Sequence, residues 1–143
     1  MTVDNSAYRI EPRIPAVEDY LKLRREAGLS PFSREAAERG LPNSIFAVCL
    51  MHGEETVGMG RIIGDGGCFF QVTDIAILPA HQGRGLAKWI MQALTAYMNE
   101  ALPKTAYVSL IADVPANRLY QQFGFAETAP GSLGMSKVLK PEI

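Results

Sequence analysis

Three consecutive segments rich in apolar and β-branched residues, joined by two short turns, place the strongest constraint on how this chain can fold. The segments span Ser44–Met51, Thr56–Ile63 and Cys68–Leu78. The connections, residues 52–55 and 64–67, are polar and contain glycine, which is typical of turns between antiparallel strands. We therefore expect a meander of three antiparallel strands at the centre of the fold.

The segments on either side of this meander predict several helices and further strands. Apolar residues recur at helical spacing after Pro15 and again after Gly85, whereas short alternating or apolar runs indicate strands. The expected helices cover residues 15–28, 33–40, 85–100 and 113–124, and the expected additional strands cover 8–11, 106–111 and 135–139. This order predicts an α/β fold of the mixed α+β type, with a mostly antiparallel twisted sheet and helices on both faces.

Length and charge limit the domain organisation and the partners. A chain of 143 residues would leave each half short of a core if it were divided, so one domain over residues 1–143 is expected. The net charge of −1 provides no basic field for nucleic acid or an acidic membrane. No segment resembles a secretory signal, and the longest apolar run, Ile45–Met51, is far shorter than the about 20 residues of a membrane span. We expect a cytoplasmic protein without nucleic-acid or membrane partners.

The two cysteines do not form a metal-binding pattern. Cys49 and Cys68 lie in apolar stretches, and neither belongs to a Cys-x-x-Cys pair or to a Cys/His cluster with zinc spacing. We expect both thiols to be reduced and buried, and we expect no metal cofactor.

A glycine-rich turn follows the third strand of the meander and precedes the longest expected helix. The strand ends at Ile77–Pro79, and the turn and the start of the helix form the segment Gln82–Ala87. Gly83 and Gly85 lack side chains, so a ligand can approach the backbone, and the first N–H groups of a helix are unpaired. The segment predicts a cradle for phosphate or pyrophosphate. It lacks the lysine of a nucleotide-hydrolysing P-loop and the spacing of a dinucleotide fingerprint.

Two segments of the chain resemble signatures of the GCN5-related N-acetyltransferase (GNAT) superfamily. The turn Gln82-Gly83-Arg84-Gly85-Leu86-Ala87 is similar to the family's Gln/Arg-x-x-Gly-x-Gly/Ala acetyl-CoA signature. Downstream, Ala116-Asn117-Arg118-Leu119-Tyr120-Gln121-Gln122-Phe123-Gly124-Phe125 resembles its Ala-x-x-Leu-Tyr-x-x-x-Gly-Phe helix. The two segments occur in the family's order and at its usual distance. The resemblance covers residues 44–140, and the two early helices match by position only.

The resemblance implies that acetyl-CoA is the acetyl donor and that no metal takes part. Backbone amides of residues 83–87 would bind the pyrophosphate, and the pantetheine arm would run beside residues 75–77, where a backbone N–H can polarise the thioester carbonyl. Arg84 and Lys88 flank the cradle and could reach a phosphate. The expected cofactor-binding residues are Ile75, Ile77, Gln82, Gly83, Arg84, Gly85, Leu86, Ala87, Lys88 and Asp113.

The two expected catalytic residues are Tyr120 and Asp74. The resemblance places Tyr120 beside the departing sulfur, and a phenol with a pKa near 10 can give a proton or a hydrogen bond to a developing thiolate whose conjugate acid titrates near 8 to 9. Asp74 lies in an apolar strand, so its carboxylate needs a partner or a function. One alternative is that it binds or deprotonates the amine, and the other is that it forms a structural hydrogen bond. Asp113 stands where the family often has Asn, and it is expected to cap a helix, with cofactor contact or base catalysis as alternatives.

These residues and the resemblance together predict an N-acetyltransferase. An amine, most simply the primary amine of a small molecule, would attack the thioester directly in a ternary complex without a covalent enzyme intermediate. A non-catalytic acetyl-CoA-binding module, or an acetyltransferase for protein lysines or N-termini, remains an alternative. The acceptor determinants are expected in residues 20–41, for which no motif exists, and similar proteins are often homodimers.

Overall fold

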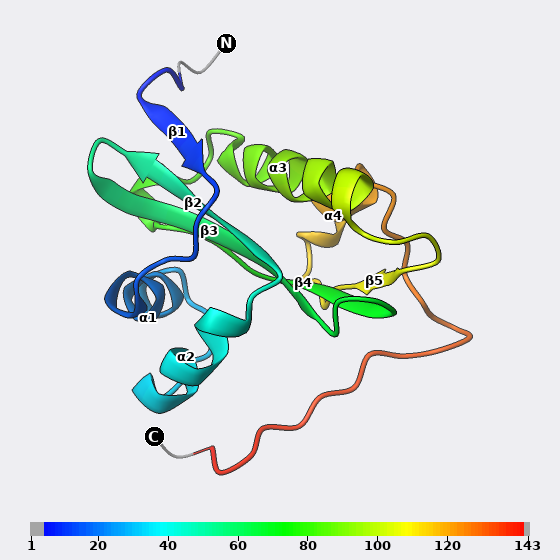
Figure 1. The fold of residues 1–143 in the computed structure, drawn as a ribbon. Coiled ribbons are helices and arrows are strands. Elements are labelled where there is room, and N and C mark those ends of the chain that lie inside the picture. Colours follow the sequence, from blue (N-terminus) through cyan, green and yellow to red (C-terminus); the bar gives the residue numbers. More distant parts are fainter. Residues whose placement is uncertain (1–4, 142–143) are drawn as a thin grey trace.

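A five-stranded sheet with the order β1-β2-β3-β4-β5 forms the centre of the protein, whose computed structural model describes residues 5–141 (Figure 1). The strands are β1 (Tyr8–Glu11), β2 (Phe46–His52), β3 (Glu55–Gly64), β4 (Phe69–Ile77) and β5 (Tyr107–Ser109). Neighbours from β1 to β4 pair antiparallel, and β5 pairs parallel with β4. The expected meander is confirmed as the middle of the sheet.

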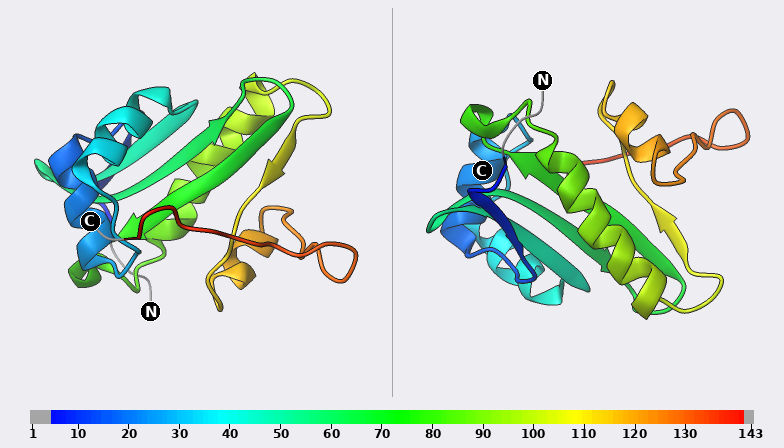
Figure 2. Two further views of the ribbon diagram at one scale, coloured as in Figure 1. Left: turned by 90° about the horizontal axis from the view of Figure 1, so that it is seen from below. Right: turned by 90° about the horizontal axis from the view of Figure 1, so that it is seen from above.

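Helices cover both faces of this sheet. One long helix, α3, crosses one face, and two shorter helices, α1 and α2, lie on the other (Figures 1 and 2). The helices are α1 (Val17–Glu26), α2 (Arg34–Gly40), α3 (Leu86–Ala101) and α4 (Asn117–Gln121), and single 3-10 turns follow α2 (Leu41–Asn43) and β4 (Pro79–His81). The predicted mixed α+β class is confirmed. No helix in the described part of the chain is long and apolar enough to cross a membrane.

Short polar side chains fix the ends of several elements. The Ser33 hydroxyl accepts a hydrogen bond from the Ala36 N–H at 3.1 Å and so caps the start of α2, as expected for a serine at this position. The turn between β3 and β4 is closed by Asp65, whose carboxylate accepts hydrogen bonds from the N–H groups of Gly67, Cys68 and Phe69. These local bonds explain why the sequence predicted both boundaries.

The core lies mainly between α3 and the sheet. Leu86, Ile90 and Leu94 form the buried stripe of α3, at the helical spacing seen in the sequence. The helix packs closely over Gly60, because a Cβ atom there would lie 2.6 Å from Ile90 Cγ2 and 2.8 Å from Ile75 Cδ1. Ile75 therefore points toward α3, and its neighbour on β4 points to the opposite face.

A bulge interrupts β4 at Asp74. The ladder between β3 and β4 shifts register here, so that Asp74 and Ile75 lie opposite Gly60, between the pairs Arg61–Thr73 and Met59–Ala76. Asp74 adopts a left-handed backbone conformation with φ 59°, which is rare for a residue with a side chain. Bulges of this kind leave a backbone group outside the ladder and redirect the strand.

The pairing of β4 with β5 is short. Only residues 69–71 of β4 pair with residues 107–109 of β5. Beyond Gln71 and Ser109 the two strands separate, and β5 leads toward α4 at the far end of the sheet (Figure 2). The sheet therefore opens on one side along the second half of β4.

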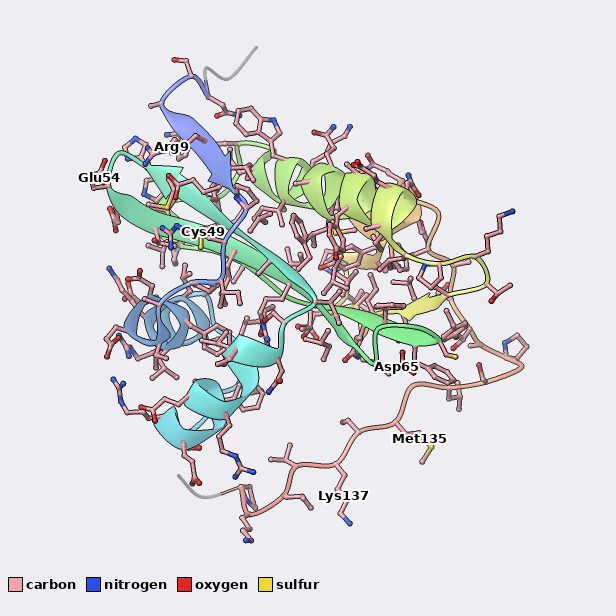
Figure 3. The ribbon with its side chains drawn as sticks, in the orientation of Figure 1. Arg9, Cys49, Glu54, Asp65, Met135 and Lys137 are labelled. Atoms are coloured by element: carbon pink, nitrogen blue, oxygen red, sulfur yellow. The ribbon has the colours of Figure 1, made fainter. Side chains whose placement is uncertain are left out.

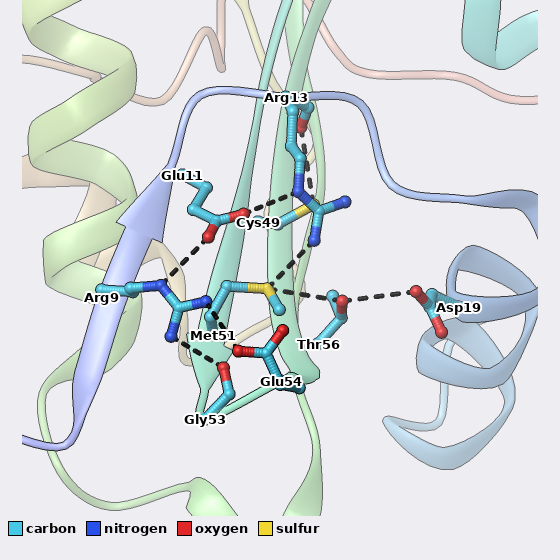
Figure 4. Close-up of polar contacts among 9 residues, drawn as sticks. All are labelled: Arg9, Glu11, Arg13, Asp19, Cys49, Met51, Gly53, Glu54 and Thr56. Carbon is cyan, nitrogen blue, oxygen red and sulfur yellow. Dashed lines mark hydrogen bonds and ion pairs between the residues drawn. The ribbon is translucent and has the colours of Figure 1, made fainter.

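A polar network joins the edge strand β1 to its neighbours (Figure 4). Glu11 accepts a hydrogen bond from the Nε of Arg9 at 3.0 Å and one from the Nε of Arg13 at 2.8 Å. The two guanidinium groups hold the pKa of Glu11 below its usual value. Arg13 also contacts the sulfur of Met51 on β2 at 3.2 Å. These contacts direct the chain from β1 toward α1.

The strand expected at residues 135–139 is wrong. The chain from residue 122 to residue 141 forms turns and extended segments without helix or strand. The local pattern of apolar and polar residues fits a strand, but a strand also needs a neighbour, and no strand within residues 5–141 pairs with this segment.

Two further expectations also differ from the structure. The helix expected over residues 113–124 is limited to Asn117–Gln121, and its cap residue is Ala116, not Asp113. The carbonyl of Asp113 accepts the Ala116 N–H at 2.7 Å, so residues 113–116 form a turn before the helix begins. Cys68 is exposed and Cys49 is buried, because Cys68 lies at the turn end of β4 where the sheet is uncovered.

Candidate active site

A cavity of about 380 Å³ lies at the opening between β4 and β5. Its walls come from α1 and the loop after it, from the second half of β4, and from the segment that links β5 to α4. Four residues singled out in the sequence line it together: Asp74, Ile75, Asp113 and Tyr120. Its volume is in the range of small-molecule sites.

The carboxylate of Asp74 is held by three donors. Asp74 is 7% exposed and points to the face of the sheet covered by α1. It accepts a hydrogen bond from the Tyr20 hydroxyl at 2.9 Å and one from the Arg61 Nε at 2.8 Å, and it forms an ion pair with Arg24. Two guanidinium groups thus compensate one buried carboxylate, and both carboxylate oxygens are engaged.

This cluster, Tyr20, Arg24, Arg61 and Asp74, links α1 to the bulge in β4. Burial, followed by the negative charge of Asp74, raises the pKa of Tyr20 to about 12. Arg24 also donates from its Nε to the Ser30 carbonyl at 2.8 Å and lies 4.2 Å over the ring of Phe32. The cluster therefore shapes the loop after α1 as well as the strand. Asp74 thus forms the structural hydrogen bonds that were one of its two expected roles, and a role on the amine stays a prediction.

Tyr120 is positioned by α4 on the opposite wall from β4. Burial, followed by the charge of Asp113, raises the pKa of its phenol above the ordinary value. The hydroxyl has no hydrogen-bond partner within residues 5–141. The phenol therefore stays protonated at neutral pH and its proton is available to a ligand in the cavity.

The glycine turn before α3 has an open backbone. Gly83 and Gly85 adopt φ values of 77° and 75°, and a Cβ atom on either would meet no other heavy atom within 4 Å. The turn precedes the first N–H groups of α3, a helix of 16 residues. This geometry fits the diphosphate of a coenzyme A group, because the backbone at both glycines borders open space and the helix dipole favours an anion.

Polar contacts hold this turn against the end of β4. The Gln82 side chain donates to the Ile77 carbonyl at 2.9 Å, and Asn5 donates to the Arg84 carbonyl at 2.8 Å. Arg84 and Lys88 are exposed, whereas Leu86 is buried, so Leu86 can contribute only its backbone to a ligand. The expected residues from Gln82 to Lys88 are thus together, but they do not line the cavity that contains Tyr120. Residues 75–77 of β4 lie between the glycine turn and the cavity that contains Tyr120.

Three residues of this site, Tyr20, Arg24 and Arg61, were not predicted from the sequence. Arg61 gave the one usable signal, because a charged residue inside the apolar run Thr56–Ile63 requires a buried partner. Arg24 was indistinguishable from the other basic residues at the end of α1, which suit the helix dipole.

The fold is that of an acetyltransferase domain. A sequence model described as the Acetyltransferase (GNAT) domain matches residues 20–134. The chain therefore belongs to the GNAT family of N-acetyltransferases, as the two sequence signatures predicted.

Solved structures and a curated relative agree with this assignment. A protein of unknown function from meticillin-resistant Staphylococcus aureus, described as a probable acetyltransferase, is 47% identical, with a TM-score of 0.87 over 92% of this chain and 99% of that chain. A GNAT-family acetyltransferase from Streptococcus pneumoniae shares the fold, at 23% identity and a TM-score of 0.74 over 93% and 98% of the two chains. A candidate acetyltransferase from Gibberella zeae is 50% identical over 48 residues, which are 34% of this chain and only 25% of that protein.

Proposed function

We propose that this protein transfers the acetyl group of acetyl-CoA to the primary amine of a small molecule by direct attack in a ternary complex. The observation that carries the proposal is the cavity between the diverging strands, which a bulged strand lines on one side and Tyr120 lines on the other. A donor that passes between β4 and β5 would meet the acceptor at this point.

The start of α3 would bind the diphosphate of the donor. The backbone amides of residues 83–87 provide the hydrogen-bond donors, and the absence of side chains at Gly83 and Gly85 permits close approach. The exposed cations Arg84 and Lys88 lie on the same turn of the helix and can reach the remaining phosphate oxygens. Gln82 would hold the glycine turn against β4 through its hydrogen bond to the Ile77 carbonyl.

The bulge in β4 would orient the reacting group. When bound, acetyl-CoA supplies a thioester whose carbonyl carbon accepts the amine. The register shift places Asp74 and Ile75 outside the regular ladder, so a backbone N–H at this bulge would be available to donate to the carbonyl oxygen. The contacts of Asp74 with Tyr20, Arg24 and Arg61 hold this backbone in place. Asp74 is in this account a positioning residue.

Tyr120 would donate a hydrogen bond or its proton to the departing sulfur. Its raised pKa keeps the phenol protonated at neutral pH, and its hydroxyl makes no competing bond within the described chain. A thiolate whose conjugate acid titrates near 8 to 9 is a weaker base than the Tyr120 phenolate, so the phenol would act mainly by a hydrogen bond that stabilises the negative charge developing on sulfur.

The charges along the cavity favour an amine acceptor. Two carboxylates, Asp74 and Asp113, and one guanidinium, Arg24, line it. Asp74 is neutralised by its ion pairs, whereas Asp113 is exposed and has no ion-pair partner among the described residues. Asp113 would therefore attract a protonated amine toward the reacting carbonyl.

Direct transfer also agrees with the positions of the cysteines. Burial raises the pKa of Cys49 to about 11, so its thiol is a weak nucleophile at neutral pH. No cysteine or histidine of the described chain lines the cavity. The lining thus contains neither a thiol nor an imidazole that could carry the acetyl group as a covalent intermediate.

A thiol-release assay tests this function. The purified protein is incubated with acetyl-CoA and a panel of amino acids, polyamines, arylalkylamines, aminoglycosides and short peptides. We expect amine-dependent release of CoA with one small-molecule class and intersecting initial-rate lines when both substrates are varied. Parallel lines would contradict direct transfer, and release with peptides alone would contradict the small-molecule acceptor. Failure to bind acetyl-CoA in calorimetry would overturn the proposal as a whole.

A further inference from the structure

The buried cluster of Tyr20, Arg24, Arg61 and Asp74 carries more positive than negative charge. Arg24 and Arg61 each form an ion pair with Asp74, and no other carboxylate of residues 5–141 lies within ion-pair distance of either guanidinium. Tyr20 does not balance the difference, because its phenol has a pKa raised to about 12 and is neutral at pH 7. Two cations therefore share one anion in a buried position.

Arginines at the surface do not have this deficit. Arg9 on β1 and Glu54 in the turn after β2 lie at the outer edge of the molecule (Figure 3). Their side chains are 46% and 100% exposed, so water compensates either charge. Arg24 and Arg61 are each only 8% exposed, and a buried charge without enough partners is costly. An anionic group of a ligand would remove this cost.

Arg24 brings the excess charge to the cavity. It lines the cavity of about 380 Å³, whereas Arg61 does not. Three of the five N–H groups of its guanidinium are used, because Nε and Nη2 donate to the Ser30 carbonyl and Nη1 donates to Asp74. One hydrogen on each terminal nitrogen has no acceptor among residues 5–141. Arg24 thus retains two donors for an oxyanion.

The contacts of Arg24 hold its guanidinium in one orientation. Ser30 binds it from the loop after α1, and Asp74 binds it from β4. The ring of Phe32 lies against its face, with the guanidinium carbon 4.2 Å from the ring centroid. A guanidinium fixed in this way loses little side-chain entropy when it binds a carboxylate or a phosphate.

The opposite charge lines the same cavity on another element. Asp113, in the segment that links β5 to α4, is exposed and forms no ion pair with any residue from 5 to 141. The cavity therefore presents a cation from α1 and an anion from the segment before α4. A small molecule that carries both an amine and an oxyanion is complementary to both charges.

We propose that the acceptor is a small amino compound that also bears an oxyanion, a carboxylate or a phosphate, and that Arg24 binds this oxyanion. The inference rests on the proposed function and names the substrate class of the same cavity. The oxyanion would accept hydrogen bonds from the terminal nitrogens of Arg24, and the amine would remain for the reacting carbonyl. Arg24 is then a specificity-determining residue, and simple alkylamines and polyamines lack the group that it binds.

Matched pairs of amines test the proposal in the unaltered protein. The thiol-release assay compares amino acids with their carboxamides and O-phosphoethanolamine with ethanolamine, so each pair differs in the oxyanion. We expect kcat/KM to be at least about tenfold higher for the oxyanion member of one kind of pair, which identifies the group as a carboxylate or a phosphate. Equal or higher kcat/KM for the neutral member of every pair would overturn the proposal.

Two neighbouring arginines of α1 provide a variant and its control. Arg24→Gln removes the excess charge but leaves the ion pair between Arg61 and Asp74, and we expect it to abolish the preference for the oxyanion member, mainly through a higher KM. A purely structural role of Arg24 would instead lower kcat/KM for both members alike. Arg25→Gln alters an exposed arginine and is expected to keep the preference. A preference that persists in folded Arg24→Gln would contradict the role of Arg24.

A binding experiment separates this inference from acetyl transfer. Thermal unfolding of the protein saturated with CoA is followed with inorganic phosphate or acetate, against chloride at equal ionic strength. We expect one of the two oxyanions to raise Tm in a saturable way, an effect that Arg24→Gln abolishes and Arg25→Gln keeps. Such a rise without acetyl transfer to any amine would overturn the proposed function and leave the oxyanion site. Acetyl transfer without the rise would overturn the oxyanion site alone.

Discussion

The hydroxyl of Tyr20 donates a hydrogen bond to the Asp74 carboxylate across 2.9 Å and so joins α1 to the bulge in β4. The left-handed backbone at Asp74 costs roughly 1–3 kcal/mol for a residue with a side chain, and such a conformation persists only when its surroundings hold it. Here Arg24 and Arg61 do so together with Tyr20. The buried cluster therefore fixes the strand geometry on which the proposed carbonyl contact depends.

The variant Asp74→Asn tests whether the buried cluster around Asp74 holds β4 in place. The change leaves two buried guanidinium groups with no carboxylate, so the free energy of unfolding should fall by about 3–5 kcal/mol. Urea unfolding at pH 7 measures it, and Glu54→Gln, a fully exposed site, is the control with an expected change below about 0.5 kcal/mol. A loss below about 1 kcal/mol would show that the cluster is not needed.

The same variant separates positioning from base catalysis. If Asp74 only positions the strand, the acidic limb of the pH profile of kcat/KM persists in Asp74→Asn at a lower rate. Disappearance of that limb would instead assign the deprotonation of the amine to Asp74.

Stability should decrease in alkaline solution through Tyr20. The folded protein holds the Tyr20 proton up to a pKa of about 12, whereas the unfolded chain loses it near the ordinary value of about 10. The unfolded state thus binds fewer protons between these values, so stability is full below pH 10 and falls as the pH rises, by up to about 3 kcal/mol. Urea unfolding at pH 9 and 11 measures the decline. Tyr20→Phe should show a smaller decline, and an equal one would exclude Tyr20 as its source.

The glycine turn before α3 should be needed for the donor. Gly85→Ala places a methyl group on the open backbone at φ 75°, and we expect the affinity for CoA in calorimetry to weaken at least tenfold. Gly66→Ala is the matched control, because Gly66 has φ 86°, is equally open and lies in the turn between β3 and β4. Both should lose about 1–2 kcal/mol of stability. Equal CoA affinity in the two variants would mean that the diphosphate binds elsewhere.

Features with local causes could be predicted from the sequence. The meander follows from apolar runs and glycine turns, α3 follows from the spacing of Leu86, Ile90 and Leu94, and the cap at Ser33 is a contact between near neighbours. The glycine turn and Tyr120 were found because each lies within a short continuous signature. These features require no knowledge of which distant segments meet.

Features that depend on distant contacts could not be predicted. Asp74 meets Tyr20 and Arg24 from positions 54 and 50 residues earlier in the chain, and no motif connects them. Asp113 was expected to cap a helix, but the turn at residues 113–116 shifts the start of α4 to Asn117. The pattern at residues 135–139 predicted a strand that the structure does not form, because a strand needs a paired neighbour and local sequence does not show whether one lies beside it.

The most direct test of the proposed chemistry is the kinetics of Tyr120→Phe with the amine identified in the thiol-release assay. Loss of a general acid typically lowers the rate by 10²- to 10⁴-fold, so we expect kcat to fall at least about 100-fold while CoA affinity stays within about twofold. Tyr97→Phe is the control, because Tyr97 stacks on Phe46 with ring centroids 4.2 Å apart and lies outside the cavity. A kcat for Tyr120→Phe equal to that of the unaltered protein would contradict the account.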